Sequence, residues 1–254
     1  MSDDSIDERS DGGLAIREPP TVLVPVKVLE GQTVPEALVT FLAPAEVVVL
    51  GYHVLPEQTP TEQASMQFED RAREAVGDIA QSFRTMGREV ETRVAFTHDR
   101  DQTVERVAAE VGATALLLSN PTGAIEDVLV PLRGAVDTDR LADLVATLLG
   151  EGAGSVTLWG LGPAGGEFDA DAAVADAAAT LREWGLPDDQ VATETTATDA
   201  PLRDIVDRSG EFDVIVMGES TESLVSAILG EDEERVAKGA VAPVLVVRDR
   251  DPTE

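Results

Sequence analysis

The stretch from Val214 to Val247 contains an apolar run, two spaced glycines and a helical segment, which are the parts of a phosphate-binding loop. In such a loop, backbone N–H groups at a helix N-terminus hold the phosphate. Gly218 ends the apolar run, and Gly230 precedes the helical segment. The same stretch carries six carboxylates, of which four form the run Glu231–Glu234. The sequence thus combines the shape of a nucleotide site with a charge that opposes one.

This acidic run governs which ligand the loop could hold. Carboxylates in the first turn of a helix are favourable to its dipole by about 0.3–1 kcal/mol each. For a phosphate roughly 5 Å away, each pair of unit charges costs about 3 kcal/mol at an effective dielectric constant of about 20. A charged hydrogen bond contributes only about 1.5–3 kcal/mol. A bridging Mg²⁺ would reverse the sign, because carboxylates and phosphates can share it. We expect a solvated helix start without a cofactor; the alternative is an ATP site that requires Mg²⁺.

Other motifs give no catalytic residue and no metal site. Gly160–Gly166 matches G-x-G-x-x-G, but Pro163 interrupts it and the next predicted helix begins only near Asp169. A dinucleotide-binding turn opens directly into its helix, so we interpret this motif as a surface loop. The only histidines, His53 and His98, lie on different segments, which predicts neither a catalytic triad nor a zinc site.

The charge of the chain excludes several kinds of partner. There are 49 Asp and Glu against 19 Lys and Arg, for a net charge of −30, and the only lysines are Lys27 and Lys238. Such a charge repels nucleic acid and anionic membranes. At about 1 M salt the screening length falls to about 3 Å, so the composition is typical of a salt-accumulating (haloarchaeal-type) cytoplasm, with an acidic protein of a low-salt cell as the alternative. The chain has no cysteine, residues 1–20 are predicted to be a disordered acidic lead-in, and we expect a cytoplasmic protein.

An internal repeat indicates the fold. Thr21–Lys27 (TVLVPVK) returns as Asp127–Arg133 (DVLVPLR), 127 − 21 = 106 residues later. Apolar strands alternate with amphipathic helices through both halves, which predicts an α/β protein with two tandem domains, 21–126 and 127–250, and a tail at 251–254. In the first half we expect further strands at Glu46–Val54, Val90–Phe96 and Ala115–Ser119, with helices at Glu62–Met86 and Asp101–Val111. In the second half we expect helices at 137–150, Asp169–Trp184, Pro201–Arg208 and Glu231–Gly239, with strands at Ser155–Trp159, Val191–Thr196, Asp213–Met217 and Val244–Arg248.

The first half lacks the helix and fifth strand with which the second half ends. Only Pro121–Glu126 separates its fourth strand from the next repeat. A fifth strand usually covers the edge of the fourth, so Leu116–Ser119 would otherwise be free to pair. We therefore expect this edge to be covered by the other domain, by the lead-in, or by a second molecule in a homodimer.

The order and spacing of three strings resemble the universal stress protein family, in a tandem form. They are V-L-V-P-V at the start of each repeat, V-M-G at Met217 and Gly218, and the closing Val241–Val247. The resemblance implies open five-stranded parallel sheets, often dimeric, and in one subclass an ATP site. Nucleotide-binding members look like G-x-x-G, a spacer and then G-[ST]; here Thr221 replaces the second glycine and Glu231 replaces the hydroxyl residue.

The same family places an acidic residue just after V-P-V, where it helps to hold the nucleoside. This chain has Lys27 in one half and Arg133 in the other. The two cations could hold an acidic ligand or partner, or each could form a local ion pair. Taken together, the sequence predicts a non-enzymatic regulatory or stress-response protein with a degenerate nucleotide loop. The alternatives are an ATP or AMP sensor that uses the Gly218–Gly230 loop, and a nucleotide hydrolase that acts through a cation held by Glu231 and Asp232.

Overall fold

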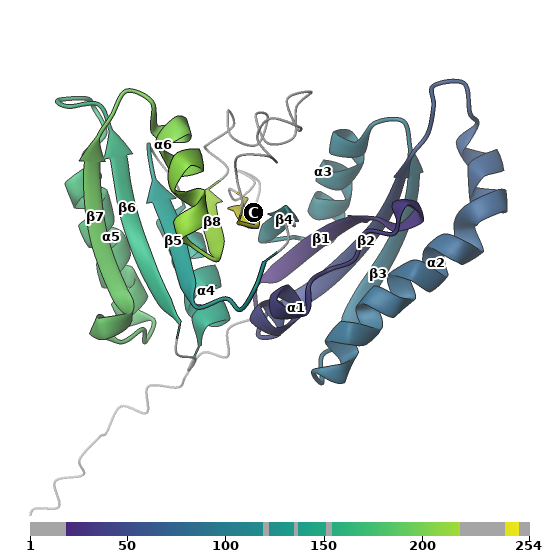
Figure 1. The fold of residues 1–254 in the computed structure, drawn as a ribbon, viewed down its shortest axis with the longest axis horizontal. Helices are drawn as coiled ribbons and strands as arrows, with labels where there is room; N and C mark the ends of the chain where they lie inside the picture. Colours follow the sequence, from purple (N-terminus) through teal and green to yellow (C-terminus); the bar gives the residue numbers. More distant parts are fainter. Residues whose placement is uncertain (1–18, 119–121, 135–136, 151–153, 219–241, 249–254) are drawn as a thin grey trace, which may run out of the picture.

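The computed structural model describes residues 19–118, 122–134, 137–150, 154–218 and 242–248. Helices and strands alternate along this part of the chain (Figure 1). The strands are β1 Thr21–Lys27, β2 Glu46–Val54, β3 Val90–Thr97, β4 Ala115–Leu118, β5 Asp127–Leu132, β6 Ser155–Gly162, β7 Val191–Ala197, β8 Val214–Gly218 and β9 Val244–Val247. The helices are α1 Glu36–Leu42, α2 Thr61–Thr85, α3 Arg100–Glu110, α4 Thr138–Leu149, α5 Ala170–Glu183 and α6 Pro201–Arg208.

All the described strands belong to one nine-stranded sheet in the order β3-β2-β1-β4-β9-β8-β5-β6-β7. Neighbouring strands pair in parallel except β4 and β9, which are antiparallel. The first half (β1 to β4) and the second half (β5 to β9) therefore run in opposite directions. Each half nevertheless repeats one order, in which its first strand lies between its second and its fourth.

Strand β9 joins the two halves. It pairs in parallel with β8 of its own half, from Ile215↔Val244 to Gly218↔Val247. On its other side it pairs antiparallel with β4, from Ala115↔Val247 to Leu118↔Val244. Just beyond it, the Arg248 N–H donates to the Thr114 carbonyl oxygen at 2.9 Å. One strand of the second half thus covers the open edge of the first.

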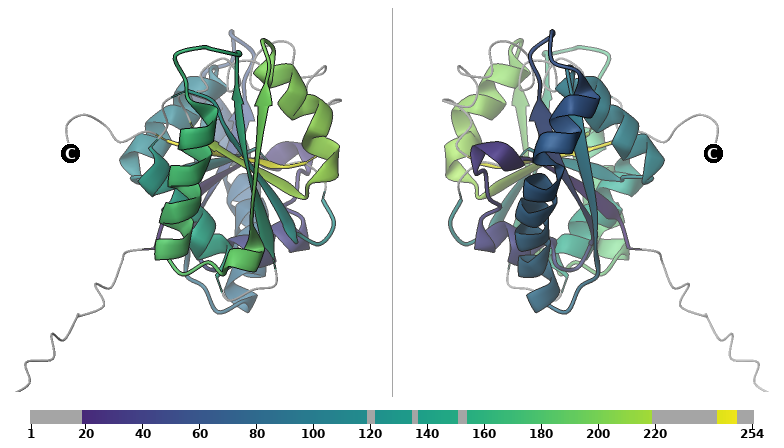
Figure 2. Two further views of the ribbon diagram at one scale, coloured as in Figure 1. Left: turned by 90° about the vertical axis from the view of Figure 1, so that its left-hand side faces the viewer. Right: turned by 90° about the vertical axis from the view of Figure 1, so that its right-hand side faces the viewer.

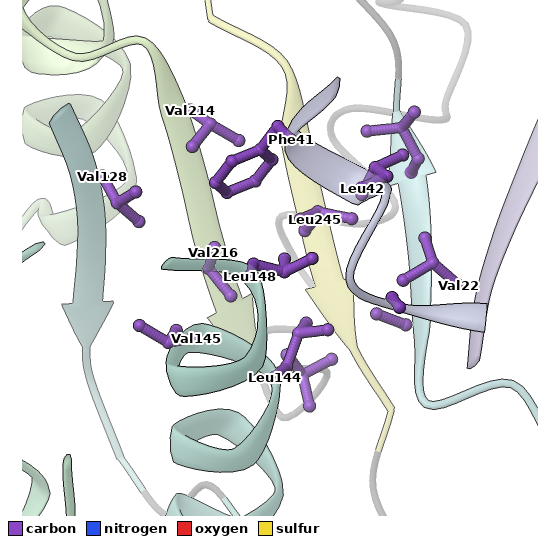
Figure 3. Close-up of a cluster of buried hydrophobic side chains, with 14 of the residues drawn as sticks. Val22, Phe41, Leu42, Val128, Leu144, Val145, Leu148, Val214, Val216 and Leu245 are labelled. Carbon is purple, nitrogen blue, oxygen red and sulfur yellow. The ribbon is translucent and has the colours of Figure 1, made fainter. Parts of the chain in front are cut away.

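The helices cover the two faces of the sheet unequally. On one face α1, α2, α4 and α5 pack on a core that runs without a break through both halves. Phe41 and Leu42 of α1 approach Leu144 and Leu148 of α4 there, next to the fully buried Leu245 of β9 (Figure 3). On the opposite face α3 and α6 cover separate, smaller clusters, one in each half. Because the sheet twists along its length, these two helices appear on opposite sides of the views in Figure 2. The halves therefore share β9 and one hydrophobic core.

A glycine in the second strand of each half lets a helix approach closely. Gly51 lies opposite Val26 in the β1–β2 register, and Gly160 lies opposite Leu132 in the β5–β6 register. A Cβ at Gly160 would stand 2.7 Å from the carbonyl oxygen of Ala170, in the first turn of α5. A Cβ at Gly51 would stand 2.2 Å from a methyl carbon of Val76 in α2. Neither position has room for a side chain.

The α/β fold predicted from the sequence is confirmed, and strands β1 and β2 have the predicted bounds. In the described part of the chain no helix or strand separates β4 from β5, as predicted. The sequence did not indicate that the two sheets are continuous. Of the coverings expected for the β4 edge, the structure shows the other half, through β9. The predicted lead-in 1–20 lies almost wholly, and the helix Glu231–Gly239 wholly, outside the described residues.

We predict that Gly160→Ala destabilises the protein by about 1–3 kcal/mol, because α5 must move away from β6 to admit the methyl group. The measurement is urea unfolding at molar KCl followed by circular dichroism. Gly77→Ala in the middle of α2 is the matched control, since a Cβ there meets no atom within 4 Å. The control should gain about 0.5–1 kcal/mol from helix propensity. Equal effects of the two variants would contradict the close strand–helix contact.

We predict that Leu245→Ala lowers the free energy of unfolding by about 2–5 kcal/mol, the usual cost of a fully buried leucine. Because β9 pairs with both halves, amide hydrogen exchange should accelerate in β1 of the first half as well as in β6 of the second. Loss of protection confined to the second half would show that the halves do not depend on a common strand.

Candidate functional site

The strand order defines a crevice in each half. In open α/β sheets, ligands bind beyond the carboxyl ends of the strands, where the strand order reverses. In the first half this point lies between β1 and β4, and in the second half between β5 and β8. Since the halves run in opposite directions, the two crevices open at opposite ends of the sheet. They form two separate candidate sites.

The second-half crevice is bordered by Gly218 and Arg133. Met217 and Gly218 end β8, and both are buried. Arg133 follows β5 and is half-buried. Burial lowers the pKa of its guanidinium below the ordinary value for arginine, since desolvation disfavours the charged form. Of the predicted loop residues, Thr221, Gly230 and Glu231 lie outside the described residues.

The first-half crevice contains Lys27 at the end of β1. Its side chain is 41% exposed, and Nζ lies 4.0 Å from a carboxylate oxygen of Glu30. In the sheet register Lys27 lies beside Tyr52, which is buried. The guanidinium of Arg100, the first residue of α3, stands 5.6 Å from the centre of the Tyr52 ring. For Lys27, a local ion pair of the kind expected from the sequence is therefore present, and it leaves the ammonium accessible to water.

Lys27 and Arg133 occupy equivalent places in their halves. Side chains alternate along a strand, so Lys27 lies on the same face as Leu23, which packs in the α3 cluster. Arg133 directly follows β5, whose Leu129 packs in the α6 cluster. Both cations thus stand at the carboxyl end of the central strand of their half. The structure does not bring them together, because β4, β9 and β8 lie between β1 and β5.

The glycine motif at Gly160–Gly166 is only partly a loop. Its first three residues continue β6, which extends to Gly162 rather than ending at Trp159 as predicted. The remainder lines a groove of about 350 Å³ with Phe168, the start of α5 and the end of β7. The carboxylate of Asp169 already accepts a hydrogen bond from the Ala172 N–H at 3.0 Å. An anion at this helix start would face that carboxylate, so the groove is a poor phosphate site.

The two histidines have structural surroundings. His53 contacts the ring of Phe96 edge-on, with 6.4 Å between the ring centres. His98 Nδ1 lies 3.3 Å from the carbonyl oxygen of Leu55. No group of three His, Asp or Glu side chains suited to a metal ion occurs among the residues the structure describes. In the same part of the chain, no helix combines the length and apolar character needed to cross a bilayer.

Sequence reasoning missed the Tyr52–Arg100 pair. Both side chains lie far apart in sequence, and only the β1–β2 register and the position of α3 place them beside Lys27. The repeat gave one signal. It placed Lys27 at the end of β1, so a residue near the end of the neighbouring strand β2, such as Tyr52, could have been expected beside it. The pairing of an arginine with a tyrosine ring, however, depends on where α3 begins.

The fold is that of universal stress proteins. A universal stress protein from Archaeoglobus fulgidus DSM 4304 superposes with a TM-score of 0.57, covering 90% of this chain and 98% of its own, at 17% sequence identity. A protein of unknown function from Pseudomonas aeruginosa PAO1 gives a TM-score of 0.49 at 16% identity, covering 91% of this chain and 92% of its own. The sequence itself matches no protein-family model and no curated protein.

Proposed function

We propose that this chain is a non-catalytic regulatory protein of the universal-stress-protein kind, in tandem form, whose two crevices recognise anionic groups. It would act in stress response by binding an acidic ligand or an acidic segment of a protein partner. The high negative charge suits work in a cytoplasm of molar salt, where the surrounding carboxylates are screened.

The observation that carries this proposal is the repeated cation at the end of the central strand. Lys27 and Arg133 are 106 residues apart in sequence and equivalent in the two halves. In a chain with only 19 basic residues among 254, a cation at the mouth of both crevices is a specific feature. An arginine also presents a planar set of N–H donors that matches carboxylate and phosphate groups.

Nucleotide binding is the second candidate, and Gly218 supports it. This glycine ends β8 at the point where the strand order reverses, and Arg133 lies across the crevice at the end of β5. A backbone N–H and a guanidinium on either side of a crevice could hold a phosphate. Against this stands the acidic run Glu231–Glu234, which disfavours phosphate unless Mg²⁺ is shared.

We predict that the full chain at molar KCl binds Mg-ATP no more tightly than about 1 mM, equivalent to about 4 kcal/mol. Isothermal titration calorimetry measures this directly. Saturable binding well below that concentration, abolished by Gly218→Val, would replace our proposal by the nucleotide sensor. Phosphate release above that of a Glu231→Ala variant would replace it by a hydrolase.

We predict that inorganic phosphate shifts the fluorescence of the second half at molar KCl, because Trp159 lies beside Pro131 in the register of β5 and β6. Replacing Arg133 by Met should weaken the apparent affinity at least about tenfold, the loss of one charged hydrogen bond. The matched control is Arg203→Met, which removes an arginine whose side chain is 82% exposed on α6 of the same half. Equal affinities of the two variants would rule out an anion site at Arg133.

A further inference from the structure

A groove of about 760 Å³ opens at the amino ends of the first-half strands. It lies at the opposite end of β1 from Lys27, so it is separate from the first-half crevice. Its floor is apolar and includes Val47, Val48 and Val90 of β2 and β3. The end of α2 and the loop after it supply one wall. The groove has about twice the volume of the one beside α5, within the range of ligand sites.

Two arginines on this wall, Arg84 and Arg88, have no acidic partner. Both are exposed, and in the described part of the chain neither forms an ion pair. Arg84 Nη2 donates to the carbonyl oxygen of Val90 at 3.5 Å. By contrast, Arg73 and Arg93 each pair with a glutamate. In a chain with 49 acidic against 19 basic residues, two such groove arginines indicate that a carboxylate reaches them from outside the described residues.

Three glutamates also line the groove, but two of them are engaged. Glu46 accepts a hydrogen bond from the Thr21 hydroxyl at 3.4 Å, and Glu91 pairs with Arg93. Glu89 is the third. The two groove arginines thus face one glutamate that has no other partner among the described residues. The groove is therefore a place of positive charge in a molecule whose net charge is −30.

The described chain begins in this groove. Pro19 and Thr21 line it, and the Pro20 carbonyl oxygen accepts a hydrogen bond from the Glu46 N–H at 3.0 Å. This bond continues the β1–β2 pairing, in which Thr21 lies opposite Glu46. Proline fixes its own φ and favours an extended conformation in the residue before it. The segment that precedes Pro19 is therefore attached at the groove by a stiff Pro-Pro pair.

The sequence before Pro19 suits the groove. Residues 1–18 lie outside the described residues and carry six carboxylates and two arginines, so they can supply what the groove arginines lack. Their one run of apolar residues is Leu14–Ile16. Ile16 precedes Pro19 by three residues, which is a reach of about 10 Å in an extended chain. The apolar run can thus contact the valine floor.

We propose that residues 14–18 of the chain dock in this groove, with Leu14 and Ile16 on the valine floor and the Glu18 carboxylate at the groove arginines. Salt at about 1 M weakens the ion pair but leaves the burial of apolar side chains as a source of stability. Docking closes the groove to other ligands and leaves residues 1–13 outside it. The contact is independent of the anion binding proposed for the two crevices.

Amide hydrogen exchange of the full chain at molar KCl tests this contact from the side of the segment. Residues 14–18 should exchange at least about tenfold more slowly than an unstructured chain, and residues 3–11 should not be slowed. Arg84→Glu combined with Arg88→Glu should reduce this protection at least about threefold. The matched control is Arg71→Glu, since Arg71 is exposed on α2 and does not line the groove. Circular dichroism should show that all variants are folded.

Labelling of arginines with phenylglyoxal, read by mass spectrometry, tests the contact from the side of the groove. In the unmodified chain the two groove arginines should react more slowly than Arg71. Ile16→Asp removes an apolar contact without altering the sheet, so it should raise their reactivity at least about threefold and leave that of Arg71 unchanged.

Three results would overturn the proposal. The first is exchange of residues 14–18 at the rate of an unstructured chain. The second is protection that is lost on about tenfold dilution, which would assign the groove to a second copy of the chain. The third is groove arginines that stay shielded in Ile16→Asp, which would assign it to another ligand.

Discussion

The pairing of β9 with two strands of opposite direction is the constraint on which the structure depends. A four-residue strand has few backbone groups, yet β9 satisfies the edge of β8 on one side and the edge of β4 on the other. Without it, β4 would present unpaired N–H and C=O groups in the middle of the molecule, which is costly when such groups are buried. Strand β9 thus covers the fourth strand of each half, so one strand serves where two separate sheets would each need a fifth.

This arrangement determines where the candidate sites lie. An antiparallel β4–β9 pair reverses the first half relative to the second, so the two crevices open at opposite ends of one sheet. Lys27 and Arg133 therefore lie in separate places, with β4, β9 and β8 between their strands. A ligand at one could influence the other only through the sheet and the common core.

The distribution of charge explains how such an acidic chain keeps specific contacts. Many ion pairs in the described residues involve exposed side chains, whose contribution is small and is screened by salt. Arg208 differs, since it is largely shielded from solvent and combines two carboxylates with an aromatic ring. Arg248 is similarly shielded and joins Glu105 of α3 to the end of β9. The few arginines with low exposure thus connect elements distant in sequence.

The sequence alone determined the α/β class, most elements and the repeated cations, because these follow from local periodicity and from a 106-residue repeat. Strand alternation and apolar runs are properties of neighbouring residues, and they predicted β1 and β2 residue for residue. The continuity of the sheet, the direction of the crevices and the Tyr52–Arg100 contact came only from the tertiary structure. The sequence predicts Val244–Val247 as an apolar strand whether or not that strand pairs with β4. Whether it pairs with β4 depends on the shared core that brings α1 against α4, and no short stretch of sequence encodes that contact.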